Sequence, residues 1–198
     1  MFWMEKELIL IIPCIVIGFT VHEFFHAYTS YKLGDYTARE DGRVTLNPLK
    51  HIDIIGFISL LLLGFGWAKP VQVNPRYYQN SAKGIALVSI AGPLSNFVLA
   101  IIGIILNIIF KYEYLGLFFT YFWMINLGMC IFNLIPIPPL DGSKILGYFM
   151  PSDGYQAYLN NEQFGLVLLL LMIYTNIFSY ITTPIYEFVY HFIYGGYL

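Results

Sequence analysis

The residues of this chain best suited to chemistry are His22-Glu23-Phe24-Phe25-His26, which fit the pattern H-E-x-x-H. If this segment is helical, His22 and His26 lie one turn apart on the same face, where two imidazoles can bind one Zn²⁺. Glu23 then lies beside them, in the place of a general base that takes a proton from a water at the metal. The pattern therefore predicts a zinc site with His22 and His26 as ligands and Glu23 as its catalytic carboxylate.

The motif lies inside an apolar run that extends from Leu8 to Tyr31. Such a run is long enough for one helix to cross a bilayer. Ionisable side chains inside a membrane span are costly, and they usually mark a functional site. The run therefore favours a metal site that lies at membrane depth.

The composition is that of an integral membrane protein. Of 198 residues, 58% are hydrophobic and 11% are charged, whereas about 25% are charged in an average soluble domain. We expect a multi-pass protein of the cell membrane, in contact with the lipid bilayer. The net charge of −2 says nothing about nucleic acid, but no basic stripe is present, so no nucleic-acid partner is expected. Cys14 and Cys130 form no CxxC pattern, so neither a disulfide framework nor a thiolate zinc site is expected.

The apolar segments predict an all-α polytopic membrane protein with about five to six transmembrane helices. We expect a single domain over residues 1–198, with a core at 8–147 and C-terminal helices within 164–198. The apolar core of Ile52–Trp67 has about a dozen residues, which is short for a crossing and suits a re-entrant element. Residues Arg43–Leu46 alternate weakly and could form a short strand. The expected spans are 8–32, 84–110, 112–134, 164–180 and a shorter one at 184–194.

Basic residues orient the chain, because lysine and arginine favour the cytoplasmic side of a membrane. Seven of the ten lie between the first span and the span that begins at Gly84: Lys32, Arg39, Arg43, Lys50, Lys69, Arg76 and Lys83. If Ile52–Trp67 dips into the membrane and returns, all seven lie on the cytoplasmic side. The same arrangement places the histidines of the motif and Asp141 on one side.

A catalytic zinc needs three protein ligands and an open position, so one ligand must come from elsewhere. Asp141 is the strongest candidate, because it follows three prolines that break a helix at membrane depth. Irregular backbone is tolerated there only if it lines a cavity or is packed in protein, and Gly142 permits a sharp turn. The alternative is that Asp141 caps a helix that starts at Ser143. Further candidate ligands are Asp53, His51, Glu113, Glu187 and His191.

Two of these further candidates have a simpler explanation. Asp53 fits better as the cap of a short helix that follows Ile52. His51 lies beside Lys50 in a polar loop, and we expect it to be solvated.

Residues 133–142 read N-L-I-P-I-P-P-L-D-G, which fits the motif N-x-x-P-x-P-x-L-D-G of the site-2 proteases at every fixed position. G-W-A-K-P-V at 66–71 and A-G-P-L-S-N at 91–96 also resemble segments of that family. Together with the H-E-F-F-H motif, the resemblance covers residues 8–147. The chain is most similar to the compact bacterial or archaeal branch, which has no attached PDZ-like or CBS-like domain.

The resemblance implies an intramembrane zinc metalloprotease in which His22, His26 and Asp141 hold one Zn²⁺ and Glu23 is the catalytic carboxylate. It also implies that Asn133 contacts the substrate or the reacting carbonyl. The expected partner is a membrane protein whose transmembrane segment unwinds locally. Such a segment could add as a strand to Arg43–Leu46 or to an edge within 52–73.

The segment at 91–96 leaves several roles open. Ser95 and Asn96 are expected to form hydrogen bonds between helices, and a substrate contact from Asn96 is a second candidate role. Gly92-Pro93 could kink a helix or admit the close approach of another element.

An alternative function is a transporter, or a proton- or metal-handling membrane protein, that uses the buried His and Asp residues. Transporters often contain paired broken helices in two related halves. This sequence has one strong proline break and no internal symmetry, which counts against that alternative.

Overall fold

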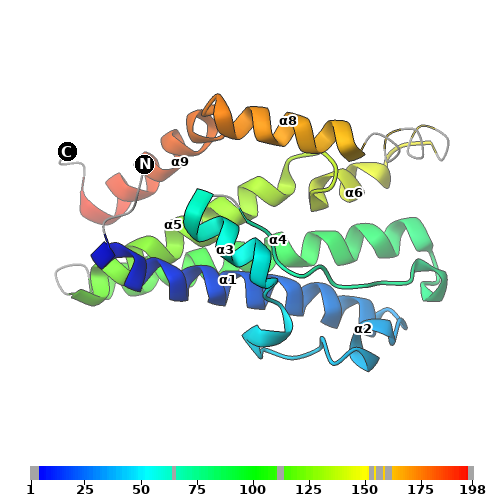
Figure 1. The fold of residues 1–198 in the computed structure, drawn as a ribbon. Coiled ribbons are helices and arrows are strands. Elements are labelled where there is room, and N and C mark those ends of the chain that lie inside the picture. The colour runs from blue at the N-terminus through cyan, green and yellow to red at the C-terminus, as the bar shows by residue number, and fades with distance from the viewer. Residues whose placement is uncertain are drawn as a thin grey trace.

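The computed structural model describes residues 5–63, 66–110, 114–151, 154, 158 and 162–195. The described part of the chain is helical and contains no strand, so the predicted all-α class is confirmed (Figure 1). Its helices and turns are α1 (Glu5–Lys32), α2 (Thr37–Glu40), η1 (Pro48–Lys50), α3 (Ile54–Leu63), η2 (Pro75–Tyr77), α4 (Ser81–Phe110), α5 (Tyr114–Leu134), α6 (Asp141–Gly147), α8 (Glu162–Tyr174) and α9 (Ile177–Tyr194).

Three helices of the described chain, α1, α4 and α5, are long and apolar enough to cross a membrane. Helices α8 and α9 are long and apolar enough to cross a membrane only when taken together, and the pair is bent by 59°. The described residues therefore offer three spans, or four if the bent pair is one span, and not the expected five to six. The difference lies in the C-terminal part, where the expected spans 164–180 and 184–194 correspond to α8 and α9 and make at most one span together. Helix α3 adds no further span, because its 10 residues extend over about 15 Å of a hydrocarbon core of about 30 Å.

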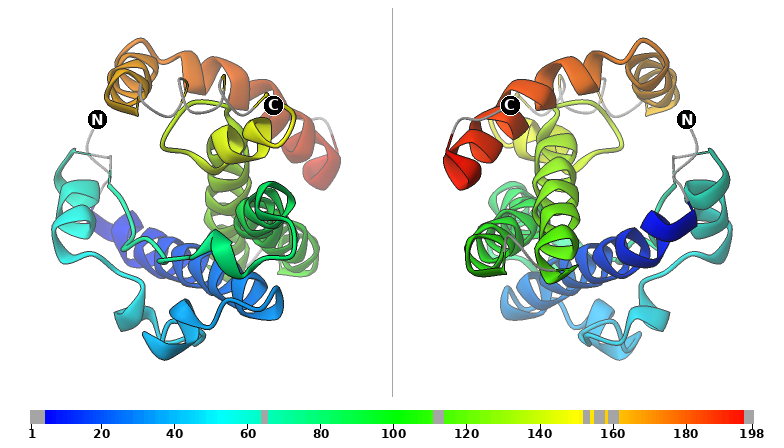
Figure 2. Two further views of the ribbon diagram at one scale, coloured as in Figure 1. Left: turned by 90° about the vertical axis from the view of Figure 1, so that its right-hand side faces the viewer. Right: turned by 90° about the vertical axis from the view of Figure 1, so that its left-hand side faces the viewer.

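Helices α1, α4 and α5 pack into a bundle. Trp123 of α5 and Ala100 of α4 are each 1% exposed and form a core cluster that Ile193 of α9 joins. Figure 2 shows α8 and α9 as a layer on the opposite side of α5 from α1.

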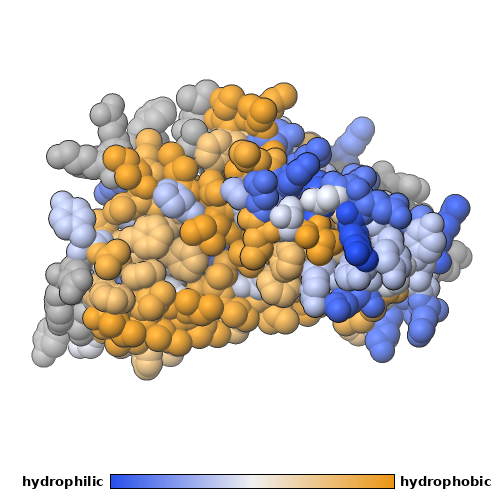
Figure 3. Space-filling view, turned by 90° about the horizontal axis from the view of Figure 1, so that it is seen from below, coloured by the Kyte–Doolittle hydropathy of each residue, from blue (hydrophilic) through white to orange (hydrophobic). Residues whose placement is uncertain are grey.

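The molecule has an apolar body and one polar end. Figure 3 shows hydrophobic side chains over most of one face, and hydrophilic ones gathered at the end where α1 finishes and α2 follows. Lys32, the last residue of α1, and Arg39 of α2 belong to this end. The separation is the one expected when an apolar body lies in lipid and a polar end lies in water.

The segment that was expected to be re-entrant begins and ends at the same place. Ile52 and Ala68 form an isolated antiparallel bridge, and the N–H of Lys69 donates to the carbonyl of His51 at 2.8 Å. Helix α3 lies between these two ends. The chain thus runs out through α3 and comes back beside its starting point at Ile52. Among the described residues, β structure is limited to this one bridge.

The expected strand at Arg43–Leu46 is wrong. The chain there remains close to α2, because the backbone N–H of Arg43 donates to the carbonyl of Ala38 at 2.8 Å. The Arg43 side chain is turned inward and the residue is 5% exposed. An alternation of polar and apolar residues over four positions is too short a signal to outweigh this local turn.

Asp35, directly after α1, is fully buried and anchors the polar end. Its Oδ1 accepts hydrogen bonds from the N–H and Oγ1 of Thr37, at 3.0 and 2.6 Å. Its Oδ2 accepts from Ser30 Oγ at 2.8 Å and from the N–H of Asn74 at 2.6 Å. Burial alone would raise the pKa of Asp35, but these hydrogen bonds outweigh it and lower the pKa below its usual value.

We expect Asp35→Ala to lower the free energy of unfolding by about 3 kcal/mol, because four donors lose a charged partner in a buried place. The folded-state pKa lies below the unfolded value of about 3.9, so this stabilisation is complete above that value. It is lost as the pH falls through the folded-state pKa. Thermal unfolding in detergent, measured from pH 7 downward, tests this. The unfolding temperatures of the wild type and the variant should approach each other in acid.

Asp41→Ala is the matched control, because Asp41 is an exposed carboxylate at the other end of α2. It should change the unfolding temperature little at any pH. If the difference in unfolding temperature between the wild type and Asp35→Ala stays constant into acid, the stabilising role of the ionised Asp35 carboxylate is contradicted.

Candidate metal centre

His22, His26 and Asp141 converge on one point inside the molecule. His22 Nε2 and His26 Nε2 are 2.9 Å apart. Asp141 Oδ2 lies 3.2 Å from the first nitrogen and 3.0 Å from the second. All three residues are less than 9% exposed, so the structure brings together the three predicted ligands, which are 119 residues apart at most.

The outer ring nitrogens of both histidines are hydrogen-bonded, and this determines where their protons lie. His26 Nδ1 is 2.7 Å from the carbonyl of Val88, which only accepts, so this nitrogen carries the proton. His22 Nδ1 is 2.6 Å from Asn96 Oδ1. In the neutral form of both rings the Nε2 atoms then carry the lone pairs, and these atoms lie next to one another and to a carboxylate oxygen.

Such a triangle of lone pairs is stable when a cation lies within it. Two imidazole nitrogens and one carboxylate oxygen form a donor set that suits zinc, and ligands about 2.0 to 2.1 Å from a tetrahedral zinc lie about 3.3 Å apart. The observed separations of 2.9 to 3.2 Å are close to this value. The three side chains therefore fit one zinc ion with a small outward adjustment.

Gly92 of α4 provides the room for both rings. A Cβ atom at this position would lie 2.5 Å from the His26 ring and 2.7 Å from His22 Cε1. The close approach that Gly92-Pro93 could admit is therefore present. The A-G-P-L-S-N segment thus forms the wall behind the imidazoles.

Asp141 does not cap its own helix, so the capping alternative is wrong. Asp141 is the first residue of α6, and Leu140, in the cap position, makes no side-chain cap hydrogen bond. The Oδ1 atom of Asp141 forms an ion pair with Lys144 at 3.5 Å. Gly142 is needed here, because a Cβ would lie 2.3 Å from the carbonyl of Leu134.

Glu23 lies beside the two histidines. Its carboxylate is close enough that it and the imidazoles of His22 and His26 each offer a ligand atom within 4.8 Å of the others. Glu23 is 9% exposed, and its Oε2 is 4.0 Å from Arg43 Nη2. A carboxylate at the edge of such a site can accept a proton from a water molecule there.

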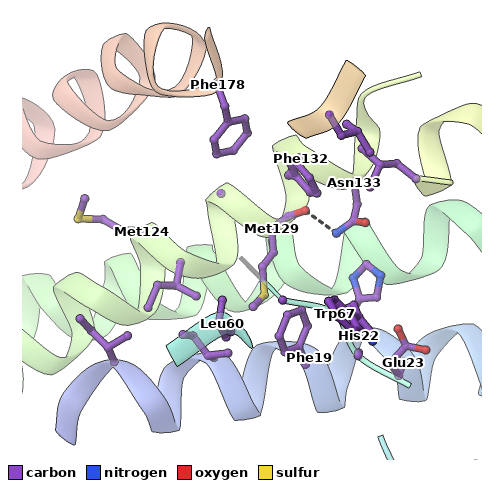
Figure 4. A pocket seen from close by; sticks show the side chains of 18 of the residues that line it. Phe19, His22, Glu23, Leu60, Trp67, Met124, Met129, Phe132, Asn133 and Phe178 are labelled. Carbon is purple, nitrogen blue, oxygen red and sulfur yellow. Dashed lines mark hydrogen bonds between the residues drawn. The ribbon is translucent and has the colours of Figure 1, made fainter. Parts of the chain in front are cut away.

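The site opens into a large apolar cavity of about 910 Å³. His22, Glu23 and Asn133 are the groups of the site that line it (Figure 4). The remaining wall is mostly apolar and comes from α1, α3, α5, α8, α9 and the segment after α3. Labelled in Figure 4 are Phe19, Leu60, Trp67, Met124, Met129, Phe132 and Phe178.

The two asparagines predicted to meet substrate lie in different places. Asn133 lines the cavity, and its Nδ2 donates to the carbonyl of Met129 at 2.9 Å (Figure 4). Asn96 is fully buried behind His22. It also donates to the carbonyl of Gly18 at 3.2 Å, so the interhelical hydrogen bonds expected of it are present and the substrate contact has no support.

The other candidate ligands lie outside the centre. Asp53 Oδ1 accepts from the N–H of Gly56 at 2.8 Å, which confirms that it caps α3. His51 is fully buried, so the expectation that it is solvated is wrong; its Nε2 donates to the carbonyl of Thr45, and burial lowers its pKa. Glu187 and His191 belong to α9 and take no part in the centre. Glu113 lies outside the described residues.

Sequence reasoning missed Asn126 and Arg43. Asn126 Oδ1 accepts from Asn96 Nδ2 at 3.0 Å, and Asn126 Nδ2 donates to the carbonyl of Phe122 at 2.8 Å. An amide in the middle of an apolar span is unusual enough to have identified Asn126. No comparable signal existed for Arg43, since an arginine in a polar loop is normally exposed.

Asn96→Ala should weaken zinc binding by about 10- to 100-fold, because His22 loses the partner that orients its ring and fixes its proton on Nδ1. Competition of the purified protein with a zinc chelator measures this. Asn107→Ala is a matched control in the same helix: Asn107 is also fully buried and donates to the carbonyl of Gly116, far from the histidines. Equal zinc affinities for both variants would contradict the role given to Asn96.

Known proteins resemble this chain over most of its length. "Putative zinc metalloprotease YwhC" of Bacillus subtilis (strain 168) is 40% identical over 181 residues, which are 86% of this chain and 82% of that protein. "Putative zinc metalloprotease MJ0611" of Methanocaldococcus jannaschii is 32% identical over 168 residues, 77% of this chain and 82% of that protein. "Putative zinc metalloprotease Rip2" of Mycolicibacterium smegmatis is 27% identical over 175 residues, 84% of this chain and 67% of that protein.

The profile of Peptidase family M50 matches residues 111–173, which include Asn133 and Asp141. No solved structure matches the chain at a significant level. The chain therefore belongs to peptidase family M50, the site-2 proteases.

Proposed function

We propose that this protein is a zinc metalloprotease that hydrolyses peptide bonds within or near the transmembrane segments of membrane proteins. The observation that carries the proposal is the buried meeting of His22, His26 and Asp141 beside Glu23, at the wall of an apolar cavity. The relatives are each named "Putative zinc metalloprotease", and these names support the same chemistry.

His22, His26 and Asp141 would hold one zinc ion through Nε2, Nε2 and Oδ2. When bound, zinc supplies Lewis-acid chemistry, which polarises a carbonyl and makes water more acidic. Glu23 would take the proton of the attacking water and later give it to the leaving amine. Asn133, which lines the cavity, would donate a hydrogen bond to the reacting carbonyl.

The cavity suits an extended apolar peptide better than a folded helix. A helix shields its peptide bonds with its own hydrogen bonds, so a substrate must unwind before it reaches Glu23. The segment around Trp67 and Ala68 lines the cavity, and it would receive the unwound peptide as an added strand. The substrate class is therefore a membrane protein with a helix that unwinds readily.

We further propose a place in the cell membrane, with several spans and with the polar end on the cytoplasmic side. Its support is the number of lysines and arginines at the end of α1 and in the sequence that follows it. Labelling of single engineered cysteines by an impermeant reagent tests this. Labelling of a cysteine in the α2 loop from outside intact cells would contradict it.

The direct test uses the purified protein in detergent or liposomes. We expect one bound zinc for each chain, together with cleavage of a membrane peptide that stops on addition of a chelator and resumes with zinc. Metal flux through liposomes without any cleavage would instead support a transporter.

A further inference from the structure

Arg43 carries a positive charge into the interior of the polar end. The residue is 5% exposed, although it belongs to the loop between α2 and η1. A charged side chain is almost never buried without partners that compensate for its lost hydration. The burial of Arg43 therefore indicates that its side chain has specific partners and a role in positioning them.

The partners of the guanidinium come from two separate parts of the chain. Nη2 donates to the carbonyl of Lys69 at 2.6 Å, and Nη1 donates to the carbonyl of Pro70 at 3.2 Å. On the other side, Nη2 is 4.0 Å from Glu23 Oε2. Among the lysines and arginines of the described residues, Arg43 is the one whose side chain lies within 4.0 Å of the Glu23 carboxylate.

The two carbonyls belong to the segment after α3, whose first residues line the cavity. Lys69 and Pro70 directly follow Trp67 and Ala68, which are part of the cavity wall. The start of this segment is tied by the Ile52–Ala68 bridge. The guanidinium ties its end, and it does so within ion-pair distance of the catalytic carboxylate.

We propose that Arg43 is a positioning residue that fixes the segment Trp67–Pro70 relative to Glu23, so that a peptide bound along this segment is aligned for attack. The inference rests on the proposed protease function. Arginine is needed because its planar fork donates to two carbonyls and still faces a carboxylate, whereas lysine is a single point of charge. The shape of the guanidinium matters here, in addition to its charge.

Arg43→Lys and Arg43→Gln in the full zinc-loaded chain test this. We expect faster hydrogen–deuterium exchange of the backbone amides at 66–74, with exchange of α4 and α5 unchanged. Misalignment of reacting groups costs about 100-fold in rate, so kcat for cleavage of a membrane peptide should fall by about that factor while KM changes far less. Zinc content should stay that of the wild type, because Arg43 contacts none of the three ligands.

Arg39→Lys and Arg39→Gln are the matched controls. Arg39 lies four residues earlier, is exposed and donates to Tyr31 Oη at 3.1 Å. Both variants should keep the wild-type kcat and the wild-type exchange at 66–74.

Several results would overturn the proposal. Wild-type kcat and wild-type exchange in Arg43→Lys would show that the guanidinium fixes nothing. Loss of zinc, or faster exchange throughout the chain, would show a general structural role instead. If the wild type itself cleaves no membrane peptide, the proposed function fails, and exchange at 66–74 still decides whether Arg43 holds this segment.

Discussion

Glu23→Gln should reduce the cleavage of a membrane peptide by about 1000-fold while the protein keeps its zinc. General acid–base catalysis by one positioned group contributes about 100- to 10,000-fold to a rate. A glutamine has nearly the same size and shape, but its amide does not accept the proton of the attacking water. The three convergent ligand atoms belong to other residues. The measurements are kcat for the peptide and the zinc content of the same preparation.

Glu40→Gln is the control for this variant, because Glu40 is an exposed carboxylate in α2. Its kcat and zinc content should equal those of the wild type. Proteolysis at the wild-type rate by Glu23→Gln would refute the role of Glu23 as general base. Loss of zinc from Glu23→Gln would place Glu23 among the ligands instead.

Asp141→Asn should weaken zinc binding by more than 100-fold, since loss of an outer partner of a ligand already costs about 10- to 100-fold. The substitution keeps the size of the side chain and removes the anionic member of the proposed set of three ligands. A neutral amide oxygen is a much poorer partner for a divalent cation. Titration of the purified protein with zinc against a chelator of known affinity measures the loss, and peptide cleavage should disappear with it.

Asp53→Asn is the matched control for the ligand variant. Asp53 caps α3, and asparagine caps a helix about as well as aspartate does. Zinc affinity and cleavage should both remain near the wild-type values. An Asp141→Asn protein that binds zinc as tightly as the wild type would remove Asp141 from the centre and overturn the proposed donor set.

Local patterns predicted the part of the centre that one helix carries. Four-residue spacing places His22 and His26 on one face of any helix, so their proximity needed no tertiary information. Asp141 could be nominated from its place after a proline break, but the same place suited a helix cap equally well. Only the packing of α1 against the segment after α5 decided between these alternatives.

Other expectations failed where local signals are weak. A pattern of four residues predicted a strand at Arg43–Leu46, yet the side chain of Arg43 is turned inward by contacts with Lys69 and Pro70. His51 was expected in solvent because its neighbours in the sequence are polar, yet it is fully buried. The partners of the Arg43 side chain are 26 and 27 residues away, and His51 bonds to the carbonyl of Thr45 within its own loop. Sequence periodicity carries no information about either kind of contact.

The sequence by itself determined that this is a helical membrane protein with a metal-binding motif, because hydrophobic run length and helical spacing depend on neighbouring residues alone. Tertiary structure decided which carboxylate meets the histidines, which amide orients His22 and which side chain contacts Glu23. These contacts join α1 to Asp141, Asn96 and Arg43. They depend on how helices pack, which is set by the shapes of many side chains together and not by the spacing of a few.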